Sequence, residues 1–374
     1  MSYSQVGSHR SMVFDANRNE LYAQAIRKFV TPDSVVLDLG AGLGVHGLLA
    51  AAAGAKRVYL VEPEPVVQIA KEIARANGLA DRIVVLEGRI EDVELPEQVD
   101  LIISVFTGNL LYTEDLLPSL FHARDRYLKP GGHLIPDYAE LLLAPVSAPD
   151  IHAKHISCWS EPHLGLDFSA ARRFVANEIL WLNRDELKSE QLAPAAVLSS
   201  GDLTRMSRAD CRGEAHFKIE KSDTCHGLLG WIRIRLGDEW LSTDPANPEV
   251  HWLPALLPLD PPLQLEQGEE IEISLQRPAQ GDWTWATKAA SGSRRHSSFL
   301  ARLDGPSRLR KMAPDYSPGL NQRGENTRHV LAMMQAGRSN QEIAQSLAES
   351  DPKAFPGVES AMQMVQGLAK RYGK

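Results

Sequence analysis

The stretch DLGAGLGVHG, residues 38–47, places four glycines between an apolar run and a helical pattern. Glycines at such a junction let backbone N–H groups approach a ligand at the N-terminus of a helix. Counted from Gly42, the spacing is G-x-G-x-x-G, as in dinucleotide-binding loops, and Glu62 follows twenty residues later, where an acid binds a ribose diol. The stretch therefore predicts a site for a nucleotide-like cofactor rather than a bare turn.

An acid, Asp38, opens the glycine-rich stretch and bears on which cofactor binds there. A carboxylate in a site of low dielectric repels the pyrophosphate of NAD, whereas it attracts the ammonium and the sulfonium of S-adenosylmethionine (SAM). Glu91, near the end of the third expected strand, is a candidate acceptor for an adenine amino group. These acids favour SAM over NAD, although the ribose acid Glu62 suits either cofactor.

The segments around this site alternate between strand-like and helix-like patterns as far as residue 140. Such alternation predicts an α/β domain with a parallel, doubly wound sheet over residues 33–140. The expected strands are 34–40, 56–62, 82–88, 99–105 and 133–137, and the expected helices are 45–53, 65–79 and 116–128. The glycine-rich stretch then lies between the first strand and the helix that follows it.

Beyond residue 140 the pattern changes to strand-like segments joined by proline-rich connections. This change predicts an antiparallel β-barrel or sandwich over residues 141–310, interrupted by a helical insertion around 168–180. Residues 291–310, which are rich in serine and arginine, are expected to form a loop or linker. The tail is expected to form a small helical module, residues 318–374, with helices at 324–337, 339–350 and 358–373.

The overall composition narrows the possible partners and the compartment. A net charge of −8 over 374 residues argues against a general nucleic-acid binder, and leaves a basic protein or a cationic small molecule open. Cys158, Cys211 and Cys225 give neither a disulfide framework nor a metal motif, so we expect no metal and a reducing, cytoplasmic compartment. The N-terminus lacks a secretory signal, and no apolar run is long enough to span a membrane.

Residues 12–22, MVFDANRNELY, bring several side chains to one face of an expected helix. Met12, Asp15, Arg18 and Tyr22 lie at intervals of three, three and four residues. Met12 and Tyr22 suit either a core or a ligand pocket. Asp15 and Arg18 suit either a structural ion pair or a binding site, so this face is a candidate part of the cofactor site.

Over roughly residues 3–290, ordered segments of the chain resemble the protein arginine methyltransferases. The matching segments, in order, are Tyr3 in the N-terminal aromatic motif, His9, Met12, Asp15 and Arg18 in the first cofactor-covering helix, VLDLGAGLG, VYLVE, GRIEDVELP, DLIISVFTGNLLYTED, HLIPD, HGLLGWIRIRL, and Val250-His251-Trp252 in the Thr-His-Trp loop of the family. The resemblance implies cofactor-covering helices at 1–32, a Rossmann-like SAM-binding domain and a β-barrel. It also implies SAM-dependent N-methyl transfer to an arginine/guanidino or related amine.

The resemblance assigns roles to individual residues of this chain. Cofactor contacts are implied for His9, Met12, Arg18, Asp38, Gly40, Gly42, Gly44, Glu62, Glu91 and Ser104. Catalytic roles are implied for Glu114, His251 and Asp15, with Asp15 orienting His251, and substrate contacts are implied for Tyr3, Val105, Phe106 and Trp252. Tyr112 is a further aromatic residue that suits either the channel wall or the core. An arm near residues 152–182 implies a head-to-tail homodimer.

The sequence departs from the family in the loop that carries two glutamates, because Val105 replaces the first and only the second, Glu114, is kept. Losing one charge-assisted hydrogen bond to a protonated guanidinium costs about 1.5–3 kcal/mol, a ~10–150-fold effect.

Three interpretations stay open. The first is arginine methylation with Glu114 alone or with an acid supplied elsewhere. The second is methylation of an imidazole, amine or hydroxyl of a peptide or natural product, with Glu114 or the Asp15–His251 pair as general base. The third is SAM binding without methyl transfer, against which the retained Glu114, Asp15, His251 and Trp252 argue.

The tail stretch AGRSNQEIAQSLAES resembles the first helix-turn of bacterial helix-turn-helix regulators. The segment before the next helix at Val358 contains Pro352 and Pro356, and it is too long for a compact helix-turn-helix. The tail is therefore loosely similar to a small winged-helix or peptide-chaperone module. A helical cap on the barrel is an equal alternative.

Overall fold

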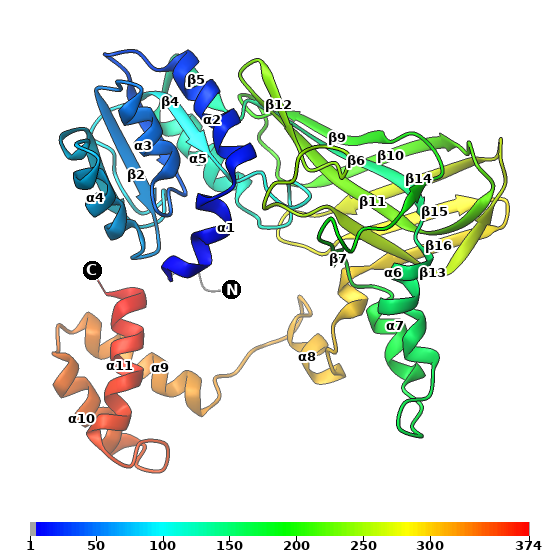
Figure 1. The fold of residues 1–374 in the computed structure, drawn as a ribbon. Helices are drawn as coiled ribbons and strands as arrows, with labels where there is room; N and C mark the ends of the chain where they lie inside the picture. Colours follow the sequence, from blue (N-terminus) through cyan, green and yellow to red (C-terminus); the bar gives the residue numbers. More distant parts are fainter. Residues whose placement is uncertain (1–4, 374) are drawn as a thin grey trace. The chain divides into compact units, whose positions relative to one another are not determined.

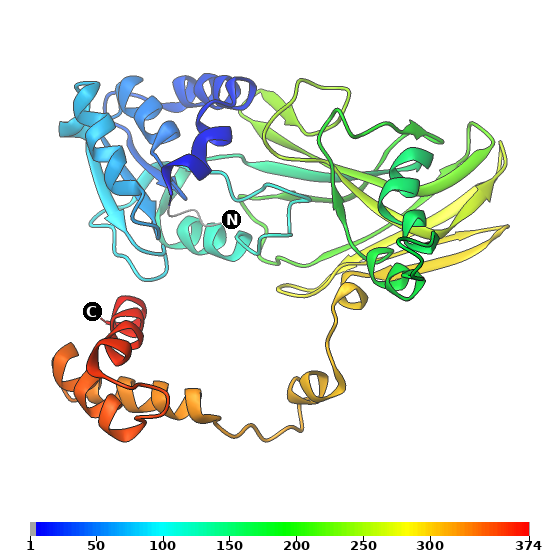
Figure 2. The ribbon, with the colours of Figure 1, turned by 60° about the horizontal axis from the view of Figure 1, so that its bottom comes forward.

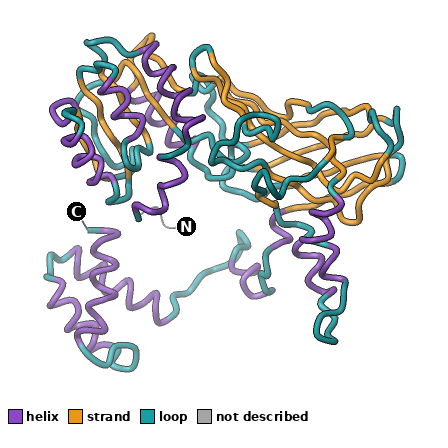
Figure 3. The backbone as a smooth tube through the Cα atoms, viewed as in Figure 1, coloured by secondary structure: helices purple, strands orange, loops and turns teal. Residues whose placement is uncertain are grey.

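The computed structural model describes residues 5–373, and the chain divides between Leu303 and Asp304 into two compact units (Figure 1). The first unit contains all the strands of the described chain, and the second is built from helices (Figure 3). Each unit has its own apolar core. None of the described helices combines the length and the apolar character that crossing a membrane requires.

The first unit opens with three short helical segments and a parallel sheet. The segments are η1 (Val6–His9), α1 (Arg10–Val13) and α2 (Ala16–Phe29). The five-stranded sheet has the order β3-β2-β1-β4-β5 and confirms the predicted doubly wound architecture. Its elements are β1 (Val35–Leu39), α3 (Val45–Ala52), β2 (Arg57–Glu62), α4 (Val67–Ala76), η2 (Ala80–Arg82), β3 (Ile83–Glu87), β4 (Val99–Ser104), α5 (Leu117–Tyr127) and β5 (Leu128–Ile135). Strand order reverses between β1 and β4, and ligands of such sheets bind at this reversal, outside the carboxyl ends.

The two faces of the parallel sheet are covered by different helices. Right-handed crossovers place α3 and α4 on one face, because they lead toward β3, and α5 on the other, because it leads toward β5 (Figures 1 and 2). The last strand begins at Leu128, five residues before the prediction. Gly131 adopts a left-handed φ of 77°, and the pairing shifts register after Val99, so the strand passes through a bulge.

The rest of the first unit is built from antiparallel strands. They are β6 (Tyr138–Ser147), β7 (Leu180–Trp181), β8 (Glu190–Gln191), β9 (Ala196–Asp202), β10 (Cys211–Lys218), β11 (Asp223–Leu236), β12 (Glu239–Ser242), β13 (Ala255–Leu265), β14 (Glu270–Arg277), β15 (Thr284–Ala289) and β16 (Gly292–Ser297). One sheet has the order β7-β13-β11-β6-β8, with β12 on β11 and β9 on β6, and the other has the order β10-β14-β15-β16. This confirms the predicted change from parallel to antiparallel structure.

Contacts between the two antiparallel sheets close them into a barrel. At one seam, a Cβ atom on Gly213 of β10 would overlap the carbonyl of Leu198 in β9, so the two strands are in backbone contact. At the other seam, Arg294 Nε of β16 donates to the carbonyl oxygen of Pro261 in β13, 2.6 Å away. Trp285, which is fully buried, donates from its indole to the carbonyl oxygen of Pro258, 2.7 Å away, inside the barrel.

Two expectations for this region were wrong. Residues 291–310 are not a linker, because β16, the 3-10 helix η5 (Ser298–Ala301) and α8 (Pro306–Lys311) lie there. In β16 only His296 is buried, and it stacks on Trp285. The other residues of this edge strand are polar or glycine, so the sequence shows no apolar alternation there. The helical insertion starts earlier than predicted and consists of α6 (Pro149–His155), η3 (Ser157–Ser160), η4 (Ser169–Ala171) and α7 (Arg172–Val175), which project from the barrel (Figure 1).

The second unit is a helical bundle of α9 (Gln322–Gln335), α10 (Asn340–Ser350) and α11 (Val358–Tyr372), with α8 before it. The three predicted tail helices are confirmed. Its fully buried side chains are Val330, Ile343, Ala344, Leu347, Ala361 and Val365. Ser339 and Glu342 form a capping box that begins α10. The winged-helix interpretation is wrong, because residues 304–373 contain no strand that could form a wing.

Candidate active site

The glycine-rich loop after β1 is the first part of the candidate site. Gly40, Gly42 and Gly44 have φ values of 74°, 53° and 80°, which favour glycine. A Cβ atom on Gly40 would overlap the ring of Phe106, and one on Gly42 would lie 2.9 Å from His9 Nδ1. The structure thus brings two predicted site residues, His9 from the N-terminal segment and Phe106 from the loop after β4, onto the glycine loop.

Two buried acids, Asp38 and Glu62, lie at the ends of the neighbouring strands β1 and β2. Asp38 accepts from the Gly47 N–H at 2.7 Å, and Glu62 accepts from the Gly42 N–H at 3.0 Å. Burial raises the pKa of Asp38 to about 7, and the charge of Glu62 adds to this rise. Burial also raises the pKa of Glu62. Both acids therefore favour a ligand that stabilises a carboxylate, either a cation or a hydroxyl donor.

Arg18 of α2 is buried near Asp38, with which it interacts electrostatically, and its side-chain hydrogen-bond partners are neutral. Its Nη2 donates to the Met12 carbonyl oxygen at 2.8 Å and to Asn19 Oδ1 at 3.1 Å, and its Nη1 lies 3.4 Å from His251 Nε2. No carboxylate lies within ion-pair distance of this guanidinium in the described part of the chain. Burial lowers the pKa of Arg18, and an unpaired buried charge is costly. The arrangement calls for an anionic ligand.

The contact that the resemblance implied between Asp15 and His251 is present. Asp15 Oδ1 accepts from the Arg18 N–H at 3.0 Å and caps α2. Its Oδ2 accepts from the backbone N–H of His251 at 2.8 Å and from His251 Nδ1 at 3.0 Å. Since arginine only donates, Nε2 of His251 must accept from Arg18, which assigns the proton to Nδ1. Burial lowers the pKa of His251, which favours this neutral form.

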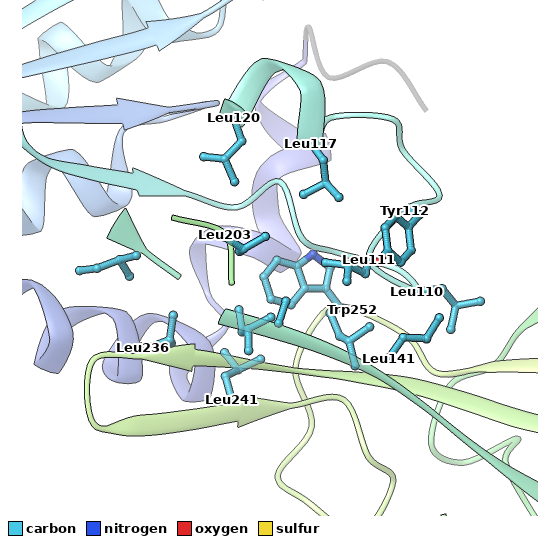
Figure 4. Packing of buried hydrophobic residues seen from close by; sticks show 14 of the residues in the cluster. Leu110, Leu111, Tyr112, Leu117, Leu120, Leu141, Leu203, Leu236, Leu241 and Trp252 are labelled. Atoms are coloured by element: carbon cyan, nitrogen blue, oxygen red, sulfur yellow. The ribbon is translucent and has the colours of Figure 1, made fainter. Parts of the chain in front are cut away.

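The loop between β4 and α5 carries Glu114. Three consecutive residues, Asn109, Leu110 and Leu111, have left-handed φ values of 31°, 53° and 63°. Non-glycine residues rarely adopt this conformation, and each costs about 1–2 kcal/mol. Burial offsets the cost, because Leu110 and Leu111 belong to the main core, in which Figure 4 shows them with Trp252.

Glu114 itself is exposed, and Asn109 Nδ2 donates to its Oε1 at 3.2 Å. Partial loss of water around the carboxylate raises the pKa of Glu114. Val105 is half-buried against the main core. The neighbouring acid Asp115 does not replace the missing glutamate, because both its oxygens bind Arg277 at 2.7 Å.

The remaining predicted residues have different surroundings. Ser104 is buried and accepts from the Phe106 N–H at 3.1 Å. Glu91 accepts from Ser119 Oγ and pairs with Arg89 at 3.4 Å. Trp252 is buried, and the Arg18 guanidinium lies 5.6 Å from the centroid of its ring. Tyr3, also implied as a substrate contact, lies outside the described residues.

The interpretation of Tyr112 as a channel wall is wrong. Its ring is buried, and its hydroxyl lies 2.7 Å from Ser199 Oγ in the barrel. Sequence reasoning also missed Asn19, which accepts from Arg18, and Asn109, which binds Glu114. The signal for Asn109 was only its place within the Glu114 loop, because its second partner, Leu253, is 144 residues away.

Comparisons with known proteins agree with this architecture. Residues 36–132 match the family described as "Methyltransferase domain", and residues 137–284 match "Arginine methyltransferase oligomerization subdomain". The chain is 35% identical over 285 residues to protein arginine N-methyltransferase 6 of Xenopus laevis, covering 72% of this chain and 83% of the relative. It is 31% identical over 328 residues to probable protein arginine N-methyltransferase 6 of Arabidopsis thaliana, covering 73% of each.

Solved structures share the fold. The Trypanosoma brucei PRMT1 enzyme-prozyme heterotetrameric complex with AdoHcy matches with a TM-score of 0.71 and 26% identity, over 79% of this chain and 99% of that one. Protein arginine methyltransferase 10 of Arabidopsis thaliana, described as uniquely open, matches in fold with a TM-score of 0.68 and 23% identity, over 79% of this chain and 99% of that one. The chain therefore belongs to the protein arginine methyltransferase family of SAM-dependent methyltransferases.

Proposed function

We propose that this protein transfers a methyl group from SAM to a guanidino nitrogen of an arginine side chain in a protein or peptide, with Glu114 holding the acceptor. The observation that carries the proposal is the buried Arg18, which has neutral partners and no carboxylate within ion-pair distance in the described residues. A ligand carboxylate would complete this site, and SAM carries one on its methionine portion.

The charges around Arg18 fit the rest of the cofactor. We propose that Asp38 binds the ammonium, Glu62 the ribose hydroxyls and Glu91 the adenine amino group, while His9 and Met12 cover the cofactor over the loop of Gly40, Gly42 and Gly44 and Ser104 closes its edge. When bound, SAM supplies an electrophilic methyl group on its sulfonium. A buried cation beside two buried acids matches a zwitterionic ligand better than a pyrophosphate.

On the acceptor side we propose that Glu114 Oε2, which Asn109 leaves free, accepts a hydrogen bond from the guanidinium. This contact fixes one nitrogen for in-line attack, with Val105, Phe106 and Trp252 as the apolar surroundings. The S–C bonding electron pair would stay on sulfur as the N–C bond forms, and Glu114 Oε2, which accepts a hydrogen bond from the nitrogen, would take the proton that this nitrogen releases. One carboxylate provides part of the orienting power of two, so turnover is expected but slower.

The Asp15–His251 pair fits a positioning role better than that of general base. His251 Nδ1 bonds to Asp15 and its Nε2 faces Arg18, so both ring nitrogens are engaged in the described structure. Without a free nitrogen on His251, the interpretation in which this pair deprotonates an imidazole or hydroxyl acceptor has no support. We propose that the pair fixes the position of Arg18 relative to the barrel loop that contains His251.

We also propose a homodimer in which the arm of one subunit contacts the other. The arm carries three exposed apolar side chains at its tip, Leu164, Leu166 and Phe168, which are 87%, 59% and 41% exposed. Arg172 ties the arm to the barrel through two hydrogen bonds to Asp260, at 2.6 and 3.0 Å. Exposed apolar side chains at the tip of a fixed arm are typical of an interaction surface, and a second copy of the chain would bury them. Light scattering should show a dimer that Leu164→Asp with Leu166→Asp dissociates, while Leu300→Asp should leave it intact.

The proposed activity is tested with SAM and a synthetic peptide that contains one arginine. Mass spectrometry should show addition of one methyl group, and S-adenosylhomocysteine (SAH), not NAD, should raise the melting temperature of the protein. Glu114→Gln should lose turnover about 10–150-fold and keep its affinity for SAH. Full activity of this variant, or stabilisation by NAD alone, would contradict the proposal.

A further inference from the structure

Asn109 makes two hydrogen bonds that point to different loops. Its Nδ2 donates to Glu114 Oε1 at 3.2 Å, and its Oδ1 accepts from the backbone N–H of Leu253 at 3.4 Å. Leu253 directly follows His251 and Trp252 in the loop before β13. One carboxamide therefore joins the loop that carries Glu114 to the loop that contacts α2.

The backbone around Asn109 is held in one conformation by close packing. A Cβ atom on Gly108 would lie 2.5 Å from Trp252 Nε1, so the chain passes directly against the indole. On the other side, Leu110 and Leu111 are buried, and Leu110 packs near Gly230 of β11. Asn109 has a φ of 31°, which asparagine tolerates better than most side chains. Few residues besides asparagine could adopt this backbone and still donate to a carboxylate.

The hydrogen bond matters because Glu114 has a single carboxylate to orient. A glutamate side chain on an exposed loop rotates among several conformers, whereas a donor on Oε1 restricts the rotation and leaves Oε2 for another partner. Partial loss of water around the carboxylate raises the pKa of Glu114, and the hydrogen bond from Asn109 opposes this rise. The carboxamide thus stabilises the ionised form that a cationic acceptor requires.

We propose that Asn109 is the positioning residue of the acceptor site. It orients Glu114 in a loop where Val105 stands in place of a second carboxylate. It also fixes the position of Glu114 relative to the loop that contains His251. This inference rests on the proposed function, because Glu114 has to bind the acceptor. The arrangement makes Asn109 a determinant of turnover without contact to the methyl donor.

Two variants distinguish the effect of the Asn109 hydrogen-bond donor from the effect of its backbone conformation. Asn109→Asp keeps the shape and an acceptor for the Leu253 N–H, but faces Glu114 with a like charge. Asn109→Gly keeps the left-handed backbone and removes the side chain. Asn183→Asp is the matched control, since the Asn183 amide donates to Glu186 Oε2 at 3.4 Å on the exposed surface.

With the one-arginine peptide, both Asn109 variants should lower kcat about tenfold or more, with the larger loss in Asn109→Asp. The acid limb of the pH–rate profile should move about one pH unit higher in Asn109→Asp, because the ionised form of Glu114 is disfavoured. The affinity for SAH and the melting temperature of the SAH complex should match those of Asn183→Asp. An acid limb unchanged in both variants would overturn the proposal.

A second measurement keeps this test separate from that of the proposed function. Carboxyl 13C NMR of glutamate-labelled full-length protein, with Glu114→Gln to identify the resonance, reports the pKa of Glu114 without a substrate. It should rise in both Asn109 variants and stay in place in Asn183→Asp. If the wild type fails to methylate arginine but this pKa rises, the proposed function fails and the contact stands. If the pKa does not move, the inference fails whatever the activity.

Discussion

The donor and acceptor halves of the site are built in different ways. On the donor side, Asp38 and Glu62 end two paired parallel strands, and Arg18 lies on a helix of fourteen residues. On the acceptor side, Glu114 lies in an irregular loop with left-handed residues, and its orientation depends on side-chain contacts. The proposed donor site thus rests on regular elements and the proposed acceptor site on a loop, and this loop contains Val105, where the family resemblance implies a glutamate.

The largest expected effect concerns the donor side. Arg18→Met removes the buried cation that we propose binds the cofactor carboxylate, so calorimetry should show SAH affinity at least about 100-fold weaker. Arg27→Met, in the same helix, removes an exposed arginine paired with Glu20 and should bind SAH like the wild type. Binding by Arg18→Met within threefold of the wild type would break the contrast between the two halves.

A smaller effect is expected from restoring a carboxylate on the acceptor side. Val105→Glu should raise kcat for the one-arginine peptide about 10–150-fold, because a guanidinium gains a second charge-assisted partner. Val105→Gln, of similar size but neutral, is the control and should gain much less. Equal rates in both variants would show that charge at this position does not limit turnover.

The pH dependence of donor binding should follow Asp38. Its pKa is raised to about 7 by burial, so in the free protein the carboxyl takes up a proton as the pH falls below 7 and no longer attracts an ammonium. SAH affinity should therefore weaken about tenfold between pH 8 and pH 6. Asp38→Asn should bind weakly at every pH and flatten the profile. A wild-type profile without slope in this range would refute the link.

The smallest effect is expected from removing the second unit. Residues 304–374 have a core of their own, so a chain that ends at Leu303 should fold and bind SAH within about twofold of the full chain. Circular dichroism and calorimetry check both points. If truncation unfolds the first unit, the two units are not independent.

Much of the regular architecture was readable from the sequence. Glycines, apolar runs and helical periods identified the parallel sheet, because β1, β2 and β4 are almost continuously buried and therefore read as apolar runs. β16 was missed because a single buried side chain, His296, gives no periodicity. β5 was placed too late because Pro130 and Gly131 are residue types typical of turns, whereas they lie in a bulge between Leu128 and His133, which both pair with β4.

The site was predictable where local motifs carry it and not where the fold does. The glycine loop, Asp38 and Glu62 are close in sequence and follow strands, so their association could be foreseen. The contact of Asn109 with Leu253 spans 144 residues and depends on left-handed backbone at three consecutive positions, two of which are leucines that disfavour it. Intrinsic preferences argue against such a loop, and only tertiary packing stabilises it.

The two carboxylate oxygens of Asp15 contact two different parts of the first unit, the helix α2 and the barrel. One begins the helix that carries Arg18, and the other takes two hydrogen bonds from His251 in the barrel. Ordering the helix of Arg18 therefore lowers the entropy cost of ordering the loop of His251, and thermodynamic reciprocity requires the same effect in the other direction. The donor should tighten the binding of the acceptor, and the acceptor should tighten the binding of the donor by the same factor.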